Sequence, residues 1–197
     1  MSPEQADALI FDASVTINLL GTGMAGRIVR LLDHPVTMAD RTFREIRRHP
    51  INGCDHAGEL DELARGGHLR IETLNKDANS LFFDLIADDL DGGLDDGEAA
   101  AIALAVSTGP STAVITDDRK ARNLLARRWP MQRIHCSIDI LAVQKIEASL
   151  TRPILADAIY SALKNARMRV PVAKRAWVTD LIGAVRAADC PSLGSMT

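Results

Sequence analysis

Carboxylate side chains stand at three separate boundaries between apolar and polar sequence in this chain. Asp12 ends the first apolar segment, and Asp117 with Asp118 ends a later one. A third group, in the turn Leu94-Asp95-Asp96-Gly97-Glu98, precedes an alanine-rich segment. In α/β proteins, ligands bind outside the carboxyl ends of parallel strands, so residues at such ends can converge on one crevice. Converging carboxylates repel one another unless a cation offsets their charge, and the pattern therefore predicts a divalent-metal site.

The acidic turn also has a purely structural interpretation. Asp95 can accept hydrogen bonds from the first backbone amides of a helix, and Glu98, three residues later, can complete a capping box. This interpretation explains the spacing of the two carboxylates. It does not explain why acidic residues recur after two other apolar segments, so both interpretations of Glu98 stay open.

Length and composition fit one globular domain with a sizeable core. The chain has 197 residues, of which 47% are hydrophobic, and its mean hydropathy is close to zero. It contains no uncharged apolar stretch of about 18 residues, which a membrane span would need, and its first residues do not resemble a signal peptide. We therefore expect a cytoplasmic protein with no membrane association. The three cysteines and five histidines form no CxxC or HxxxH pair, which argues against zinc.

Charge is distributed unevenly along the chain, although the net charge is only −3. Residues 84–98 contain seven carboxylates and no basic side chain, whereas residues 119–133 contain six basic side chains and no acid. Residues 164–175 contain five more bases. Each stretch could simply be a solvated helix face. A protein that holds a polyanion beside a metal ion would show the same arrangement.

Short apolar segments alternate with amphipathic ones, which predicts an α/β fold with a doubly wound parallel sheet. We expect strands at 8–11, 69–73, 113–116 and 134–136, with 69–73 at an edge of the sheet. Helices are expected from about residue 15 and at 41–48, 53–65, 77–90, 98–107, 119–128 and 138–148. These elements predict a domain at residues 1–150.

Residues 151–197 are predicted to form a C-terminal helical extension. Two amphipathic helices follow Thr151-Arg152-Pro153 and are separated near Val170-Pro171. The second has an apolar stripe, which must be buried, at Ala173, Trp177, Leu181 and Val185. We expect the stripe to pack on the chain's own domain; a homodimer contact and a partner protein are the alternatives.

The residues Gly21-Thr22-Gly23-Met24-Ala25-Gly26 match the GxGxxG pattern of dinucleotide-binding proteins. If 15–20 were a strand, 26–32 a helix and 36–39 a second strand, Asp40 would stand where such proteins place the acid that binds a ribose. This alternative leaves the acids at the other strand ends without a role. A Rossmann-type protein that binds a dinucleotide through Gly21, Gly23 and Gly26 is therefore a second hypothesis.

The order of the acidic motifs resembles that of the PIN-domain family, metal-dependent nucleases that include VapC-type toxins. The resemblance covers about residues 8–145 and rests on FDAS followed by Asn18, FREI around Glu45, LDDGEAAAIALA and ITDDRKAR. It implies a PIN-like three-layer α/β/α fold with a mainly parallel twisted sheet. It assigns the family's acids to Asp12, Glu45, Glu98 and one of the pair Asp117 and Asp118. Without the resemblance, ion pairs along its own helix would explain Glu45.

The resemblance also implies roles for these acids and for the side chains near them. Asp12, Glu98 and Asp118, or Asp117 in its place, would bind Mg²⁺ or Mn²⁺, while Glu45 would orient water or serve a second ion. Hydrogen-bonding side chains around the acids would orient them, namely Ser14, Asn18 and Thr116. Basic side chains would hold RNA phosphates, namely Arg119, Lys120 and Arg122.

On these terms we expect a Mg²⁺- or Mn²⁺-dependent endoribonuclease, and the toxin of a toxin–antitoxin pair is one form that it could take. An ion that retains several waters suits an all-oxygen site. The expected partners are RNA, a cognate antitoxin protein and a second copy of the chain. A non-catalytic Mg²⁺-binding regulatory module, similar to phospho-accepting receiver domains, is a further alternative. Receiver domains need two acids after the first strand and a lysine after the last, and the sequence offers only Asp12 and no lysine near 134–136.

Overall fold

The computed structural model describes residues 3–48, 56–87 and 93–194. Its centre is a five-stranded sheet in which all neighbouring strands are parallel. The order across the sheet is β3-β2-β1-β4-β5, so β1 is central and β3 and β5 form the edges. The strands are β1 (Ala8–Phe11), β2 (Val36–Ala39), β3 (Leu69–Glu72), β4 (Thr112–Ile115) and β5 (Arg133–His135). The predicted α/β class, the parallel sheet and the edge position of β3 are confirmed.

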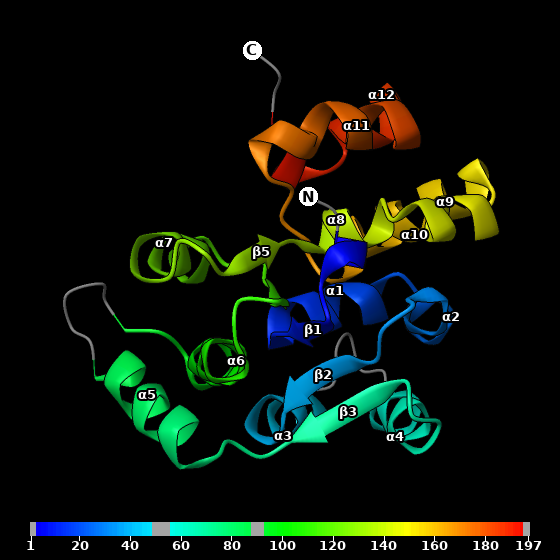
Figure 1. Cartoon of the computed structure of the whole chain (residues 1–197). Helices are drawn as coiled ribbons and strands as arrows, with labels where there is room; N and C mark the ends of the chain where they lie inside the picture. Colours follow the sequence, from blue (N-terminus) through cyan, green and yellow to red (C-terminus); the bar gives the residue numbers. More distant parts are fainter. Residues whose placement is uncertain (1–2, 49–55, 88–92, 195–197) are drawn as a thin grey trace.

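Helices cover both faces of the sheet (Figure 1). One face carries α5 (Lys76–Ile86), α6 (Asp96–Thr108) and α7 (Arg119–Arg128). The other face carries α1 (Ala13–Gly21), α2 (Ala25–Leu31), α4 (Ala57–Arg65), α8 (Ser137–Leu141), α9 (Gln144–Ser149) and α10 (Arg152–Asn165). Helix α3 (Asp40–Arg48) contacts both α1 and α6. Two short 3₁₀ turns lie near the termini, η1 (Pro3–Gln5) and η3 (Pro191–Leu193).

The C-terminal helices α11 (Val172–Ile182) and α12 (Ala184–Ala188) lie beyond α10, farthest from the sheet (Figure 1). Helix α11 contacts α10, and its Val178 and Ile182 are buried in the same hydrophobic cluster as α1. Two of the four predicted stripe residues, Trp177 and Leu181, pack against this cluster, whereas Val185 is 88% exposed and Ala173 is also exposed. The prediction fails for Val185 because Gly183, which has a φ of 85°, ends α11, so Val185 belongs to a different helix.

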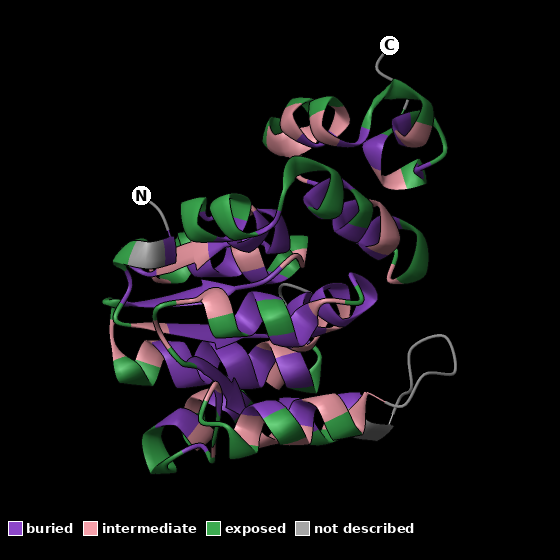
Figure 2. Ribbon diagram, turned by 90° about the vertical axis from the view of Figure 1, so that its right-hand side faces the viewer, coloured by how far each residue is buried: buried purple, intermediate pink, exposed green. Residues whose placement is uncertain are grey.

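The two faces of the sheet are packed differently. Large aliphatic side chains dominate the cluster around α1. The cluster around α6 instead contains five of that helix's alanines, Ala99, Ala100, Ala101, Ala103 and Ala105. Small side chains let a helix approach its neighbours closely, and α6 contacts β1, β2 and β4. Figure 2 shows the resulting buried layer between the helices and the sheet. Because α6 lies so close, its N-terminus reaches the ends of the central strands.

Several predicted boundaries differ from those in the structure. The helix expected at 138–148 is broken into α8 and α9, because Ala142 and Val143 leave helical geometry between them. The first part of the helix expected at 53–65 and the last part of the one expected at 77–90 fall outside the described residues. Strand β2 and helix α2, expected only under the dinucleotide hypothesis, are present.

The dinucleotide hypothesis itself is wrong. It requires a strand before Gly21, but residues 13–21 form helix α1. The glycine motif instead joins two helices: Gly23 has a φ of 69° in the turn, and the amide of Gly26, within α2, donates to Glu59 at 2.8 Å. Asp40 forms an ion pair with Arg44 on its own helix. A Gly-rich turn between a strand and a helix, which the phosphates would need, is therefore missing at this motif.

Candidate functional site

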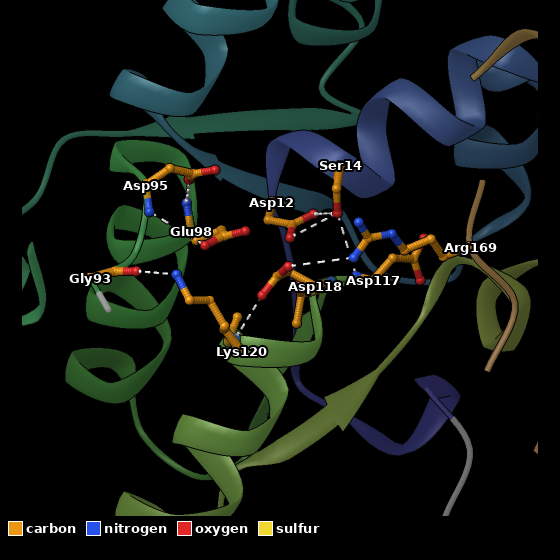
Figure 3. A network of polar contacts seen from close by, with 11 residues as sticks. Asp12, Ser14, Gly93, Asp95, Glu98, Asp117, Asp118, Lys120 and Arg169 are labelled. Atoms are coloured by element: carbon orange, nitrogen blue, oxygen red, sulfur yellow. Dashed lines mark hydrogen bonds and ion pairs between the residues drawn. The ribbon is translucent and has the colours of Figure 1, made fainter. Parts of the chain in front are cut away.

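The predicted acids meet at the carboxyl ends of the two central strands. Strands β1 and β4 pair with Phe11 opposite Ile115, and the amide of Asp12 donates to the carbonyl of Ile115 at 3.2 Å. Asp117 and Asp118 follow the end of β4 after one residue, and α6 brings Glu98 to the same place. Figure 3 shows the carboxyl groups of Asp12, Glu98 and Asp118 pointing into a shared space.

Asp12 is completely buried and serves as the N-cap of α1. Its carboxylate accepts hydrogen bonds from the amide of Val15 at 2.8 Å and from the hydroxyl of Ser14 at 2.8 Å. Burial raises the pKa of Asp12 to about 7, and the charge of Asp117 contributes to the rise. Hydrogen bonds from Thr116, Val15 and Ser14 oppose this shift. Ser14 and Thr116 thus contact the acid that they were predicted to orient.

Asp117 is held by hydrogen bonds from residues far away in the sequence. One carboxylate oxygen accepts from the side-chain amide of Asn18 and from the hydroxyl of Ser137, both at 2.5 Å. The other oxygen accepts from the backbone amide of Ser137 at 2.9 Å. Burial raises the pKa of Asp117, although these bonds and the charge of Arg122 oppose the shift. Both oxygens of this carboxylate are therefore engaged within the protein.

Asp118 is arranged differently from its neighbour. It is the N-cap of α7, where one carboxylate oxygen accepts from the amide of Ala121 at 2.9 Å. Its other oxygen lies 4.0 Å from the guanidinium of Arg169. The side chain is 22% exposed. Of the two adjacent aspartates, Asp118 is the one that retains an oxygen facing solvent and the shared space.

Glu98 combines the two roles that its sequence position suggested. The predicted capping box is present: the amide of Glu98 donates to Asp95 at 2.8 Å, and the amide of Asp95 donates back to Glu98 at 3.4 Å. Burial raises the pKa of Glu98 to about 7, and the charges of Asp95, Asp118 and Asp12 contribute. The cap and the acidic cluster therefore share this carboxylate.

Glu45 comes close to the same helix N-terminus through a contact with Gly97. A Cβ atom added at Gly97 would lie only 2.8 Å from a carboxylate oxygen of Glu45 and 3.5 Å from the Cβ of Ala13. The absence of a side chain at Gly97 thus allows Glu45 to lie against the first turn of α6. In addition, the hydroxyl of Thr42 donates to the carbonyl of Gly97 at 3.3 Å. Helix α3 is joined to the acidic turn at this point.

A cavity of about 310 Å³ lies in front of the acids. The predicted residues that line it are Ser14, Asn18, Glu98, Asp117 and Asp118. Four more lining residues were not predicted: Ile17 of α1, and three at the connection between α10 and α11, namely Ala166, Arg167 and Arg169. The basic stretch at 164–175 was the sequence signal for the two arginines.

The predicted phosphate-binding residues differ in their surroundings. Arg119 is exposed at the start of α7. The ammonium group of Lys120 donates to the carbonyl of Gly93 at 2.8 Å, and Arg122 donates to the carbonyl of Thr116 at 3.3 Å. Lys120 and Arg122 thus have contacts within the protein that help to hold the ends of α6 and β4.

The acids fit a hard divalent cation by their chemistry. Their donors are all oxygen atoms, which Mg²⁺ and Mn²⁺ prefer, and the mutual repulsion that raises the pKa of Glu98 is what a bound cation would offset. Within the described residues, however, no three Asp, Glu, His or Cys side chains are already drawn together as a metal site. The residues that could hold an ion are Asp12, Glu98 and Asp118, with Asp117 behind them.

Comparison with known proteins identifies the family of the chain. A family model described as a PIN domain matches residues 8–181, which include every acid considered above and most of the extension. No curated protein and no solved structure matches the chain. Within the described residues, no helix is long and apolar enough to cross a membrane. The chain belongs to the PIN-domain family, whose members are generally nucleases.

Proposed function

We propose that this protein is a metal-dependent endoribonuclease that hydrolyses RNA phosphodiester bonds. The observation that supports this most directly is the group formed by Asp12, Glu98 and Asp118 at the ends of β1, β4 and α6. The pKa of Glu98 is raised partly by the charges of Asp118 and Asp12, so the three carboxylates interact electrostatically. A site of this kind attracts a cation, and a cation in turn attracts a phosphodiester.

The carboxylates would divide the work of holding Mg²⁺ or Mn²⁺. Asp118 and Glu98 line the cavity and would be direct ligands, while Asp12 would approach from beneath. The bound ion would supply an activated water molecule and offset negative charge on the phosphate. Glu45, held against Gly97, would orient water at the edge of the site.

Asp117 has a different proposed role, because both of its oxygens already accept hydrogen bonds. It would fix the positions of Asn18 and Ser137 and, through its neighbour in the sequence, that of Asp118. Of the two adjacent aspartates, Asp117 would therefore have a structural role and Asp118 would bind the ion.

A toxin role, an antitoxin partner, a homodimer and a cytoplasmic location are further proposals that the resemblance to VapC-type proteins supports. An antitoxin would be recognised as a small protein that binds this chain and suppresses RNA cleavage. Coexpression with the product of an adjacent reading frame, followed by copurification and a cleavage assay, tests both properties at once.

The Asp118→Asn variant tests the proposed activity. Asparagine caps a helix about as well as aspartate, so the fold should keep its stability, while the rate of Mn²⁺-dependent cleavage of a labelled RNA should fall about 100-fold or more. Asp96→Asn is the matched control, because Asp96 is an exposed residue of the acidic turn that does not line the cavity. The proposal fails if wild-type protein does not cleave RNA in Mn²⁺, or if cleavage is equally fast in EDTA.

A further inference from the structure

The connection between α10 and α11 alternates buried and exposed side chains. Met168 and Val170 are 1% and 5% exposed, whereas Arg167 and Arg169 are exposed. The two apolar side chains belong to the main hydrophobic cluster. The backbone of this connection is therefore fixed to the core while the two arginines project from it.

Several contacts hold the connection beside the site. A Cβ added at Gly21 would lie 2.7 Å from the Cβ of Ala166, so α1 and the end of α10 are packed closely there. On the other side, Lys174 of α11 forms an ion pair with Asp139 of α8 at 2.6 Å. Arg167 has a φ of 54°, the one left-handed residue other than glycine in the described part of the chain. This left-handed backbone conformation costs on the order of 1 kcal/mol. It persists because the residues on either side of Arg167 are packed against other parts of the protein.

Arg169 is well placed to bind an anion from solvent. Its guanidinium lies 4.0 Å from Asp118, and 74% of its side chain is exposed. A long, exposed ion pair of this kind contributes little to stability, so the guanidinium can turn toward a ligand without a large loss. Arginine also has the planar geometry that binds two oxygens of one phosphate.

A second cavity, of about 540 Å³, shares two lining residues with the first. Both are lined by Asp117 and Arg169. The second also contains Arg119, Arg122 and Asn123 of α7 and the segment 170–172. Its one acid is Asp117, whose oxygens accept bonds from Asn18 and Ser137. The first cavity is therefore lined by three carboxylates and two arginines and the second by one carboxylate and three arginines, and Arg169 belongs to both.

We propose that Arg169 binds the RNA phosphate next to the one that is cleaved, with Arg119 beside it. The RNA backbone would pass from the acidic cavity into the arginine-lined one, so the C-terminal extension contributes a wall of the substrate site. This inference rests on the proposed endoribonuclease function. It goes beyond that function because it assigns substrate binding to a part of the chain outside the acidic motifs.

Binding measurements test the role of Arg169 without requiring cleavage. A fluorescent single-stranded RNA is titrated in EDTA at several salt concentrations. Arg169→Ala should raise Kd about 10-fold and reduce the slope of log K against log salt by about 0.7, the value for one lost phosphate contact. Arg169→Lys should restore the slope but only part of the affinity. Arg152→Ala is the control, because Arg152 is an exposed arginine of the extension that pairs with Asp180.

Cleavage of modified RNA then identifies which phosphate Arg169 contacts. Oligonucleotides with one uncharged methylphosphonate linkage next to the cleavage site should show a KM about 10-fold higher with wild-type protein and an unchanged KM with Arg169→Ala. Wild-type affinity and salt slope in Arg169→Ala, or equal sensitivity of both proteins to the uncharged linkage, would overturn the assignment. If RNA binds as described but is never cleaved, the endoribonuclease proposal fails and the binding role of Arg169 stands.

Discussion

The site has an inner and an outer layer, which differ in how their polar groups are used. The inner layer consists of Asp12, Asn18, Asp117 and Ser137. These side chains are largely buried and bond to one another or to nearby backbone. The outer layer consists of Glu98, Asp118, Arg167 and Arg169. Asn18 and Asp117 also line the cavity, but their polar groups are bonded within the protein. The outer residues have fewer contacts within the protein, and the one ion pair between them is 4.0 Å long.

This difference predicts that substitutions in the inner layer mainly affect stability and that substitutions in the outer layer mainly affect ligand binding. Removing a group from the inner layer leaves buried donors without acceptors, so the fold should suffer. Removing a group from the outer layer leaves solvent to replace what was lost, so mainly ligand binding should suffer. Neighbouring residues in the sequence, Asp117 and Asp118, fall on opposite sides of this division.

The largest effect on stability should come from Asp117→Ala. It leaves the buried donors of Asn18 and Ser137 without their acceptor, and each such group costs about 1–3 kcal/mol, so we expect a loss of about 3 kcal/mol in the free energy of unfolding. Asp118→Ala removes only a helix cap and should lose about 1 kcal/mol. Urea unfolding of both variants in EDTA compares the two layers directly. Equal losses would show that the division does not exist.

The stability of the protein should depend on pH and on bound metal through one acid of each layer, Asp12 and Glu98. Their pKa values are about 7 in the folded protein and lower when unfolded, so the folded state holds protons more tightly. In EDTA, the contribution of these two acids to stability should therefore be complete below about pH 4 and should be lost as pH rises through 7. Mn²⁺ at 100 times its Kd should add about 2.7 kcal/mol at pH 8 and much less at pH 5, where both acids are protonated. A melting temperature that Mn²⁺ does not change at pH 8 would contradict the metal site.

The smallest effect on stability is expected for Glu98→Gln. Glutamine keeps the reciprocal bonds of the capping box, so the free energy of unfolding should change by less than about 1 kcal/mol. The stabilisation by Mn²⁺ should nevertheless be lost, because a carboxylate ligand is missing. Differential scanning calorimetry with and without Mn²⁺ measures both quantities. A variant that still responds to Mn²⁺ like wild type would leave Glu98 with its capping role alone.

Local patterns in the sequence predicted much of the fold and the acidic half of the site. Helix α7 begins and ends where it was expected, and the spacing of Asp95 and Glu98 gave the capping box. Both depend on residues within one helical turn of each other. The start of α1 was predicted less well, because Asp12 is its N-cap and the helix begins two residues earlier than expected.

Arg169, which was missed, and the detailed arrangement of the predicted residues depend on contacts between distant parts of the chain. Arg169 reaches the acids only because α10 packs against Gly21 of α1, and no local pattern encodes that approach. The separate roles of Asp117 and Asp118 likewise depend on Asn18, 99 residues before Asp117. Glu45 reaches the acidic turn because Gly97 lacks a side chain. Tertiary packing, rather than residue type, decided these positions.

The pairing of β1 with β4 also determines when during folding the site can form. Leu9 pairs with Ala113, so the chain must close a long loop before the two strands meet. Closing such a loop loses chain entropy before any contact compensates for it, and pairings of this kind tend to form slowly. Until they form, Asp12 and Asp118 are on separate pieces of structure. A partly folded chain without this pairing therefore cannot assemble the acids, so the proposed cleavage would be delayed until the two central strands have paired.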